Sequence, residues 1–122
     1  MKRIQVVAVL VLLFVGISVA GASAWQAPMV AEIDAALDGL GFDEFIETSY
    51  RLYILRSPQR VTSMGLAAKF GVRNDALDDY SPEYQAETFA IESLILERLR
   101  GFDREMLTEA QQTTSDLSLI HI

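Results

Sequence analysis

Apolar residues recur at intervals of three and four along most of the stretch from residue 28 to residue 102, and this spacing is the strongest constraint on the fold. It places apolar side chains along one face of an α-helix. Glycine and Ser-Pro pairs divide the stretch into expected helices at 28–40, 42–56, 60–66 and 81–100. The alternating pattern and short turns of a β-hairpin are absent from the sequence. We therefore predict an all-α fold of antiparallel helices.

Capping residues mark where several of these helices start. Ser57-Pro58 and Ser81-Pro82 each combine an N-cap serine with a proline suited to the first turn. Thr108 and Gln111 have the spacing of a capping box, which predicts a further helix near the end of the sequence. Residues 69–80 carry turn-forming residues without sustained periodicity, so we expect a loop there.

The first residues have the layout of a secretory signal. Lys2 and Arg3 precede the uncharged apolar stretch Ile4–Val19, and an Ala-Ser-Ala triplet occupies 22–24. The apolar stretch has about 16 residues, fewer than the roughly 20 needed to span a bilayer. We expect residues 1–24 to be a helical signal peptide, cleaved before Trp25, giving a periplasmic or secreted protein without stable membrane association. An uncleaved N-terminal anchor is the alternative.

Composition excludes several classes of chemistry for this stretch of chain. There is no cysteine and only one histidine, so disulfides, cysteine-ligated metals and a two-histidine zinc site are excluded. The formal net charge of −7 argues against nucleic-acid binding, which needs a basic surface. We expect no catalytic, cofactor-binding or metal-ligating residue within these 122 residues.

Two groups of carboxylates are better explained as loop and surface than as sites. The first comprises Asp75, Asp78, Asp79 and Glu83, and the second comprises Glu92, Glu97, Asp103 and Glu105. The first lacks the alternating ligands and central glycine of an EF-hand, which favours a helix-capping loop. In the second, Glu92 and Glu97 lie on different faces of a helix, whereas acid–base catalysis needs converging groups.

Helix 81–100 carries apolar residues on two sides. Its main face bears Tyr84, Ile91, Leu94, Ile95, Leu99 and Phe102, whereas Phe89 and Leu96 fall elsewhere, so we expect contact with more than one neighbour. Arg98 lies within the main face and should be partly buried, which calls for a carboxylate partner. A tertiary ion pair and a substrate carboxylate both satisfy this need, and a structural role is favoured.

Aromatic residues at helical spacing are expected in the core rather than in a ligand platform. They are Tyr50, Tyr53, Tyr84 and Phe89. The nearby hydroxyls of Ser49, Thr62 and Ser63 have no histidine with which to form a catalytic triad, because the one histidine is His121 in the last residues.

Residues 117–122 depart from the composition that precedes them. They can be back-translated as CTG-TCT-CTT-ATA-CAC-ATC, the start of a transposase adapter used in preparing sequencing libraries. We therefore expect the natural reading to end at Asp116 and residues 117–122 to be an artefact of that adapter. An ordinary apolar C-terminus is the alternative.

Four short stretches together resemble a known family. They are Phe42-Asp43-Glu44-Phe45 with Tyr50-Arg51-Leu52; Ser57-Pro58-x-x-Val61-Thr62-Ser63-Met64-Gly65; Asp75-x-Leu77-x-Asp79-x-Ser81-Pro82; and Leu99-Arg100-x-Phe102-Asp103-Arg104, continuing through Leu107-Thr108 and Gln111. In this order, residues 42–116 resemble the N-terminal part of the bacterial domain-of-unknown-function family 885 (DUF885), whose members are largely helical and often exported. Val61 replaces the alanine usual in that family.

The resemblance implies a truncated piece of a longer protein. DUF885 members resemble helical zinc metallopeptidases, with an H-E-x-x-H helix far beyond the region matched here, in which two histidines would hold zinc and the glutamate would activate water. The expected partners are therefore the rest of the same polypeptide and, for the parent protein, zinc and a peptide substrate. Residues 25–41 would form an N-terminal helix preceding the DUF885-like region. The alternative is a complete, small periplasmic helical interaction module.

Overall fold

The computed structural model describes residues 26–121, so the expected signal peptide lies outside the described residues. The elements are α1 (Val30–Ala36), α2 (Phe42–Ile54), α3 (Pro58–Ser63), α4 (Ala67–Phe70), α5 (Pro82–Arg100), a 3₁₀ helix η1 (Arg104–Met106) and α6 (Glu109–His121). Within this part of the chain no strand occurs. The prediction of an all-α fold is confirmed. No helix of residues 26–121 is long and apolar enough to cross a membrane.

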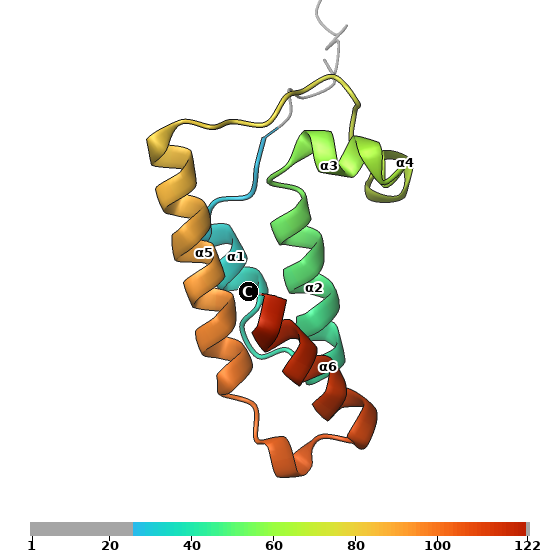
Figure 1. Ribbon diagram of the computed structural model, residues 1–122, viewed down its shortest axis with the longest axis vertical. Helices are drawn as coiled ribbons and strands as arrows, with labels where there is room; N and C mark the ends of the chain where they lie inside the picture. The colour runs from blue at the N-terminus through green and yellow to red at the C-terminus, as the bar shows by residue number, and fades with distance from the viewer. Residues whose placement is uncertain (1–25, 122) are drawn as a thin grey trace, which may run out of the picture.

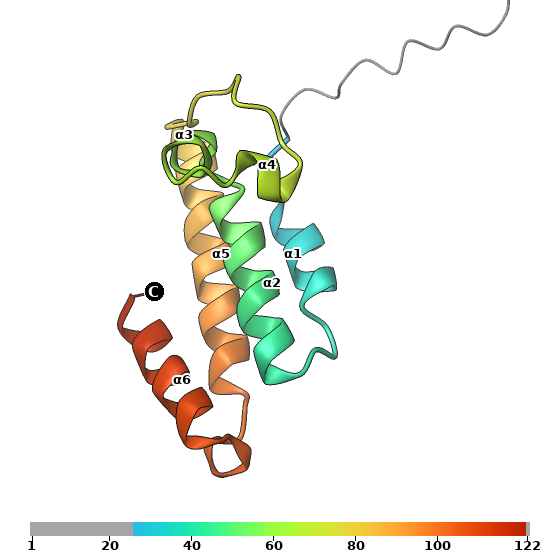
Figure 2. The same ribbon diagram turned by 90° about the vertical axis from the view of Figure 1, so that its right-hand side faces the viewer.

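Three helices form the body of the molecule, and the others extend from it. Helices α1 and α5 run in the same direction and α2 runs against them, with α3 and α4 at one end (Figure 1). Helix α6 turns back at the other end and lies on the opposite side of the α2–α5 pair from α1 (Figure 2). One side of α2 and α5 is therefore covered by α1, and the other faces α6.

The main core lies where α1, α2 and α5 meet. Its buried residues are Ile33 and Leu37 from α1, Phe42 and Phe45 from α2, and Ile91, Ile95 and Leu99 from α5. Just beyond α5, Phe102 adds an edge-on contact with Phe42, their ring centroids 5.4 Å apart. Full burial of an Ile, Leu or Phe side chain contributes about 1.5–3 kcal/mol to stability, so this cluster is the main source of hydrophobic stabilisation.

A second, smaller cluster holds α3 and α4 at the end of α2. It consists of the buried residues Ile54, Val61 and Ala67. Two glycines with positive φ allow the tight turns around it, namely Gly65 at 67° and Gly71 at 65°. A side chain would strain the backbone at either position. The expected helix at 60–66 therefore starts earlier and ends earlier, as α3, and α4 was not expected, so the loop begins after Phe70 rather than at Lys69.

The capping predictions are confirmed by hydrogen bonds. The Ser57 hydroxyl accepts from the Arg60 N–H at 3.3 Å, and the Ser81 hydroxyl accepts from the Tyr84 N–H at 3.3 Å. At the start of α6, the Thr108 N–H donates to Oε1 of Gln111 at 3.0 Å, and the Gln111 N–H donates to the Thr108 hydroxyl at 3.3 Å. This reciprocal pair satisfies two backbone donors that the first turn leaves free.

The first predicted helix is the least accurate. It was expected at 28–40, whereas α1 spans Val30–Ala36. Gly39 adopts a φ of 68°, which ends the helical path and lets the chain turn into α2. Apolar spacing continues through Leu37 and Leu40 because both contact the core from the turn that follows α1.

Candidate functional site

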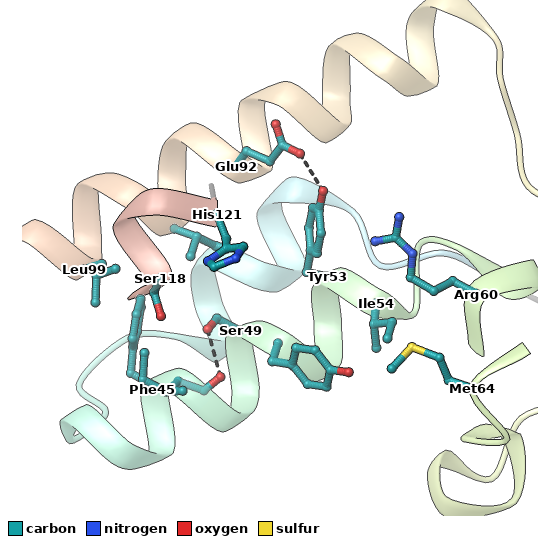
Figure 3. Close-up of a pocket in the computed structure, with 13 residues that line it drawn as sticks. Phe45, Ser49, Tyr53, Ile54, Arg60, Met64, Glu92, Leu99, Ser118 and His121 are labelled. Carbon is teal, nitrogen blue, oxygen red and sulfur yellow. Dashed lines mark hydrogen bonds between the residues drawn. The ribbon is translucent and has the colours of Figure 1, made fainter. Parts of the chain in front are cut away.

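An apolar groove runs between α2, α5 and the end of α6 (Figure 3). Its volume is about 540 Å³, which lies within the roughly 300–1,000 Å³ of small-molecule sites. The lining residues are Phe45, Ile46, Ser49, Tyr50, Tyr53, Ile54, Arg60, Met64, Glu92, Ile95, Leu99, Ser118 and His121. We call this the apolar groove. Its walls come from α2 and α5, and only two of these residues belong to α6.

One hydrogen bond joins the two walls of the apolar groove. The Tyr53 hydroxyl on α2 donates to Oε1 of Glu92 on α5 at 2.5 Å. Burial, together with this hydrogen bond and the charge of Glu92, raises the pKa of Tyr53 to about 12. Glu92 was expected on the solvated surface, and this expectation is wrong because its carboxylate is half-buried and engaged by Tyr53.

A second, more polar groove adjoins the first. Its volume is about 390 Å³, and it is lined where α2, α3 and α5 meet the loop that follows α4. Tyr53, Ile54, Arg60 and Glu92 line both grooves, so the two share a wall. Arg60 is exposed, and within residues 26–121 its guanidinium forms no ion pair or side-chain hydrogen bond. It is therefore a free cation at the rim of the apolar groove.

The hydroxyl and imidazole groups in the apolar groove do not form a catalytic arrangement. The Ser49 hydroxyl donates to the Ile46 carbonyl of its own helix at 3.1 Å. Nδ1 of His121 lies 2.7 Å from the carbonyl oxygen of Leu117, one turn earlier in α6. Both groups are therefore satisfied locally, and no nucleophile–base pair results.

Arg56 is the most deeply buried charged residue in the described chain, with 3% of its surface exposed. Its guanidinium donates to the Pro28 carbonyl at 2.6 Å, the Thr88 hydroxyl at 3.0 Å and the Tyr84 carbonyl at 3.3 Å. It forms an ion pair with Glu87 at 3.4 Å. The arginine thus connects the segment before α1 and the first turns of α5 to the end of α2.

The sequence contained a signal for Arg56 that periodicity does not detect. Tyr84, Glu87 and Thr88 are three and four residues apart, so they share one face at the start of α5. Three hydrogen-bonding side chains on one helix face call for a polar partner in the neighbouring helix.

Arg98 forms the tertiary ion pair that was one of its two expected roles. Its guanidinium pairs with Asp34 on α1 and lies 3.6 Å from Asp38 in the turn after α1. Hydrogen bonding to Asp34 raises the pKa of Arg98. Because Arg98 is 28% exposed and both carboxylates are more exposed, this pair fixes α1 on α5 at the surface rather than in the core.

Two acidic residues of the loop, Asp78 and Asp79, act as caps, as expected, whereas Asp75 forms an ion pair with Arg73 at 2.6 Å. Asp78 accepts from the Ser57 hydroxyl at 2.7 Å and from the Gln59 N–H at 2.9 Å, which ties the loop to the start of α3. Asp79 accepts from the Ser81 N–H at 2.8 Å, and this hydrogen bond lowers the pKa of Asp79. Among residues 26–121 no three His, Cys, Asp or Glu side chains form a group that could hold a metal ion.

The prediction that the aromatic residues pack in the core is wrong for two of the four. Phe89 is 70% exposed and Tyr50 is 49% exposed. Tyr84 is half-buried against Arg56, and burial raises its pKa. Helical spacing shows that residues share a face, but it does not show whether a neighbouring helix covers that face.

Comparisons of the chain with models of protein families, with curated proteins and with solved structures find no match.

Proposed function

We propose that residues 25–116 are the helical N-terminal region of an exported DUF885-like protein, which forms one wall of a cleft in a larger, zinc-dependent peptidase-like hydrolase. The family resemblance supplies the class of protein, and residues 26–121 bring no nucleophile and base together. The signal-like start of the sequence supports export to the periplasm or beyond. On this proposal residues 117–122 are not part of the natural protein.

The observation that carries this proposal is the uncovered side of α5. Phe89 is 70% exposed there, and Tyr80, just before α5, is 71% exposed. Both residues line the polar groove, so they belong to one surface of the molecule. Large exposed aromatic side chains on one surface favour packing against another protein segment. The rest of the same polypeptide is the partner that the resemblance implies.

A self-sufficient interaction module is the second candidate, and the Arg56 contacts favour it. They close the junction of α2, α5 and the segment before α1 within the described chain. The buried residues of the three-helix core likewise all lie between Ile33 and Leu99. A small periplasmic helical module with these features would fold without further chain.

Thermal unfolding of residues 25–116 separates the two candidates. As a wall that packs on the rest of its polypeptide, it should melt at a lower temperature than a chain extended past Asp116 into the peptidase-like part, and Phe89→Ser should lower the melting temperature of the extended chain only. Equal melting temperatures of the two chains would contradict the proposal and favour the module, since a self-sufficient module gains no stability from further chain. Leu77→Ser is the matched control, because Leu77 is also exposed but does not line either groove.

A further inference from the structure

The apolar groove has the properties of a ligand site that the proposed function does not use. Along α2 it is lined by Phe45, Ile46, Tyr50 and Ile54, a stripe that extends about 13 Å at 1.5 Å per residue. Ile95 and Leu99 of α5 line the groove opposite this stripe. An elongated apolar molecule lying here would exchange water for hydrocarbon contacts along its length.

Two hydroxyls on the α2 wall are already engaged, which restricts the chemistry of an occupant. The Tyr53 hydroxyl donates to Glu92, and the Ser49 hydroxyl donates to the carbonyl of Ile46. A peptide in the groove would bury backbone N–H and C=O groups against walls with few free partners, which costs free energy. An alkyl chain has no such groups and meets no such cost.

Arg60 supplies the polar end of the site. It lies past the end of the apolar stripe on α2, beside Met64, and points towards the groove (Figure 3). Its guanidinium has no anionic partner within residues 26–121. A guanidinium binds a carboxylate through paired charge-assisted hydrogen bonds.

We propose that the apolar groove binds an alkyl carboxylate, with the alkyl chain between α2 and α5 and the carboxylate at Arg60. The site does not depend on the proposed function, because 11 of its 13 lining residues precede residue 117, and only Ser118 and His121 belong to the stretch that the proposed function excludes. The formal net charge of −7 disfavours anions in general, so the assignment depends on Arg60 as the local cation.

Titration calorimetry of the purified chain with dodecanoate, below the concentration at which it forms micelles, tests the proposal. Dodecanoate should bind with a stoichiometry of one, and dodecyltrimethylammonium should bind at least about tenfold more weakly. Shortening the probe to decanoate and octanoate should lower the affinity by up to about fourfold for each CH₂ removed from the groove. Absence of dodecanoate binding, or equal binding of the ammonium probe, would overturn the proposal.

Variants locate the carboxylate. Arg60→Gln should lower the affinity for dodecanoate about tenfold, the lower end of the effect of losing a hydrogen bond to a charged group. Arg51→Gln is the matched control, because Arg51 is an exposed arginine of α2 that does not line the groove, and it should change the affinity less than twofold. His121→Ala should also change it less than twofold. Equal losses in Arg60→Gln and Arg51→Gln, or a tenfold loss in His121→Ala, would contradict the assignment of Arg60.

Discussion

The guanidinium carbon of Arg56 lies 4.1 Å from the centre of the Tyr84 ring, and the Tyr84 hydroxyl donates to the Arg56 carbonyl at 2.6 Å. The two residues therefore hold each other through both side chain and backbone. Stacking of a cation on an aromatic face contributes about 0.5–2 kcal/mol, most when the pair is shielded from water. This contact fixes the end of α2 against the start of α5 and stabilises the wall shared by the two grooves.

Arg56→Met should lower the free energy of unfolding by about 2–4 kcal/mol, because Pro28, Tyr84 and Thr88 lose a buried donor and Glu87 loses its ion pair. Arg56→Lys should recover less than half of that loss, since an ammonium cannot reproduce the planar fork of donors. Urea unfolding followed by circular dichroism measures both. Arg51→Met is the control and should fall within about 0.5 kcal/mol of the parent chain. An equal effect of Arg51→Met would refute the role of Arg56.

The Tyr53–Glu92 hydrogen bond predicts a loss of stability in alkali. The pKa of Tyr53 is raised to about 12 in the folded chain and is about 10 when unfolded. The protonated Tyr53 hydroxyl therefore contributes fully to the free energy of unfolding below pH 10. This contribution is lost as the pH rises towards 12, because the unfolded chain releases the proton first. Tyr53 is partly exposed, so solvent screening limits the effect to about 1 kcal/mol.

Absorbance titration near 295 nm identifies this group directly. Tyr53→Phe should remove the tyrosinate transition with a midpoint near pH 12, and Glu92→Gln should move that midpoint towards 10. Tyr50→Phe is the control, because Tyr50 is 49% exposed and forms no hydrogen bond to Glu92. A transition near pH 12 that persists in Tyr53→Phe would show that another tyrosine is responsible.

The core of α1, α2 and α5 should respond strongly to truncation. Ile91 is fully buried, so Ile91→Ala should lower the free energy of unfolding by about 2–5 kcal/mol through lost burial and the cavity left behind. Leu77→Ala removes a similar volume where 80% of the side chain is exposed, and it should change stability by less than about 0.5 kcal/mol. Denaturant unfolding of both variants measures the difference. Similar losses would mean that Ile91 is not in the core.

The start of α5 should depend on its cap. Ser81→Ala removes the acceptor for the Tyr84 N–H and should cost about 1 kcal/mol. Ser93→Ala is the matched control, because the Ser93 hydroxyl only bonds back to the Phe89 carbonyl inside the helix. Alanine is the better helix former, so that variant should be neutral or slightly more stable. A loss in Ser93→Ala as large as that in Ser81→Ala would contradict the assignment of the cap.

Local signals in the sequence were sufficient for the starts of α3, α5 and α6 but not for the grooves. Capping by Ser57, Ser81 and Thr108 depends on neighbours within three residues, so the sequence contains all of its determinants. The apolar face of α5 was likewise identified, since Ile91, Ile95 and Leu99 are all buried.

Two contacts across 28 or more residues were not predicted. The Tyr53–Glu92 hydrogen bond and the Arg56–Tyr84 contact depend on how α2 packs on α5. Helical periodicity fixes which residues share a face, but it does not fix the partner of that face. For the same reason the exposure of Phe89 became visible only when the neighbours of α5 were placed.

The genomic nucleotide sequence around the codon for Asp116 tests the central claim most directly. The account predicts an open reading frame that continues past Asp116 with codons unrelated to the adapter and reaches a helix with an H-E-x-x-H motif. A genomic sequence that encodes residues 117–122 as given and then stops would contradict it, and the chain would then be a small helical protein without the peptidase-like region.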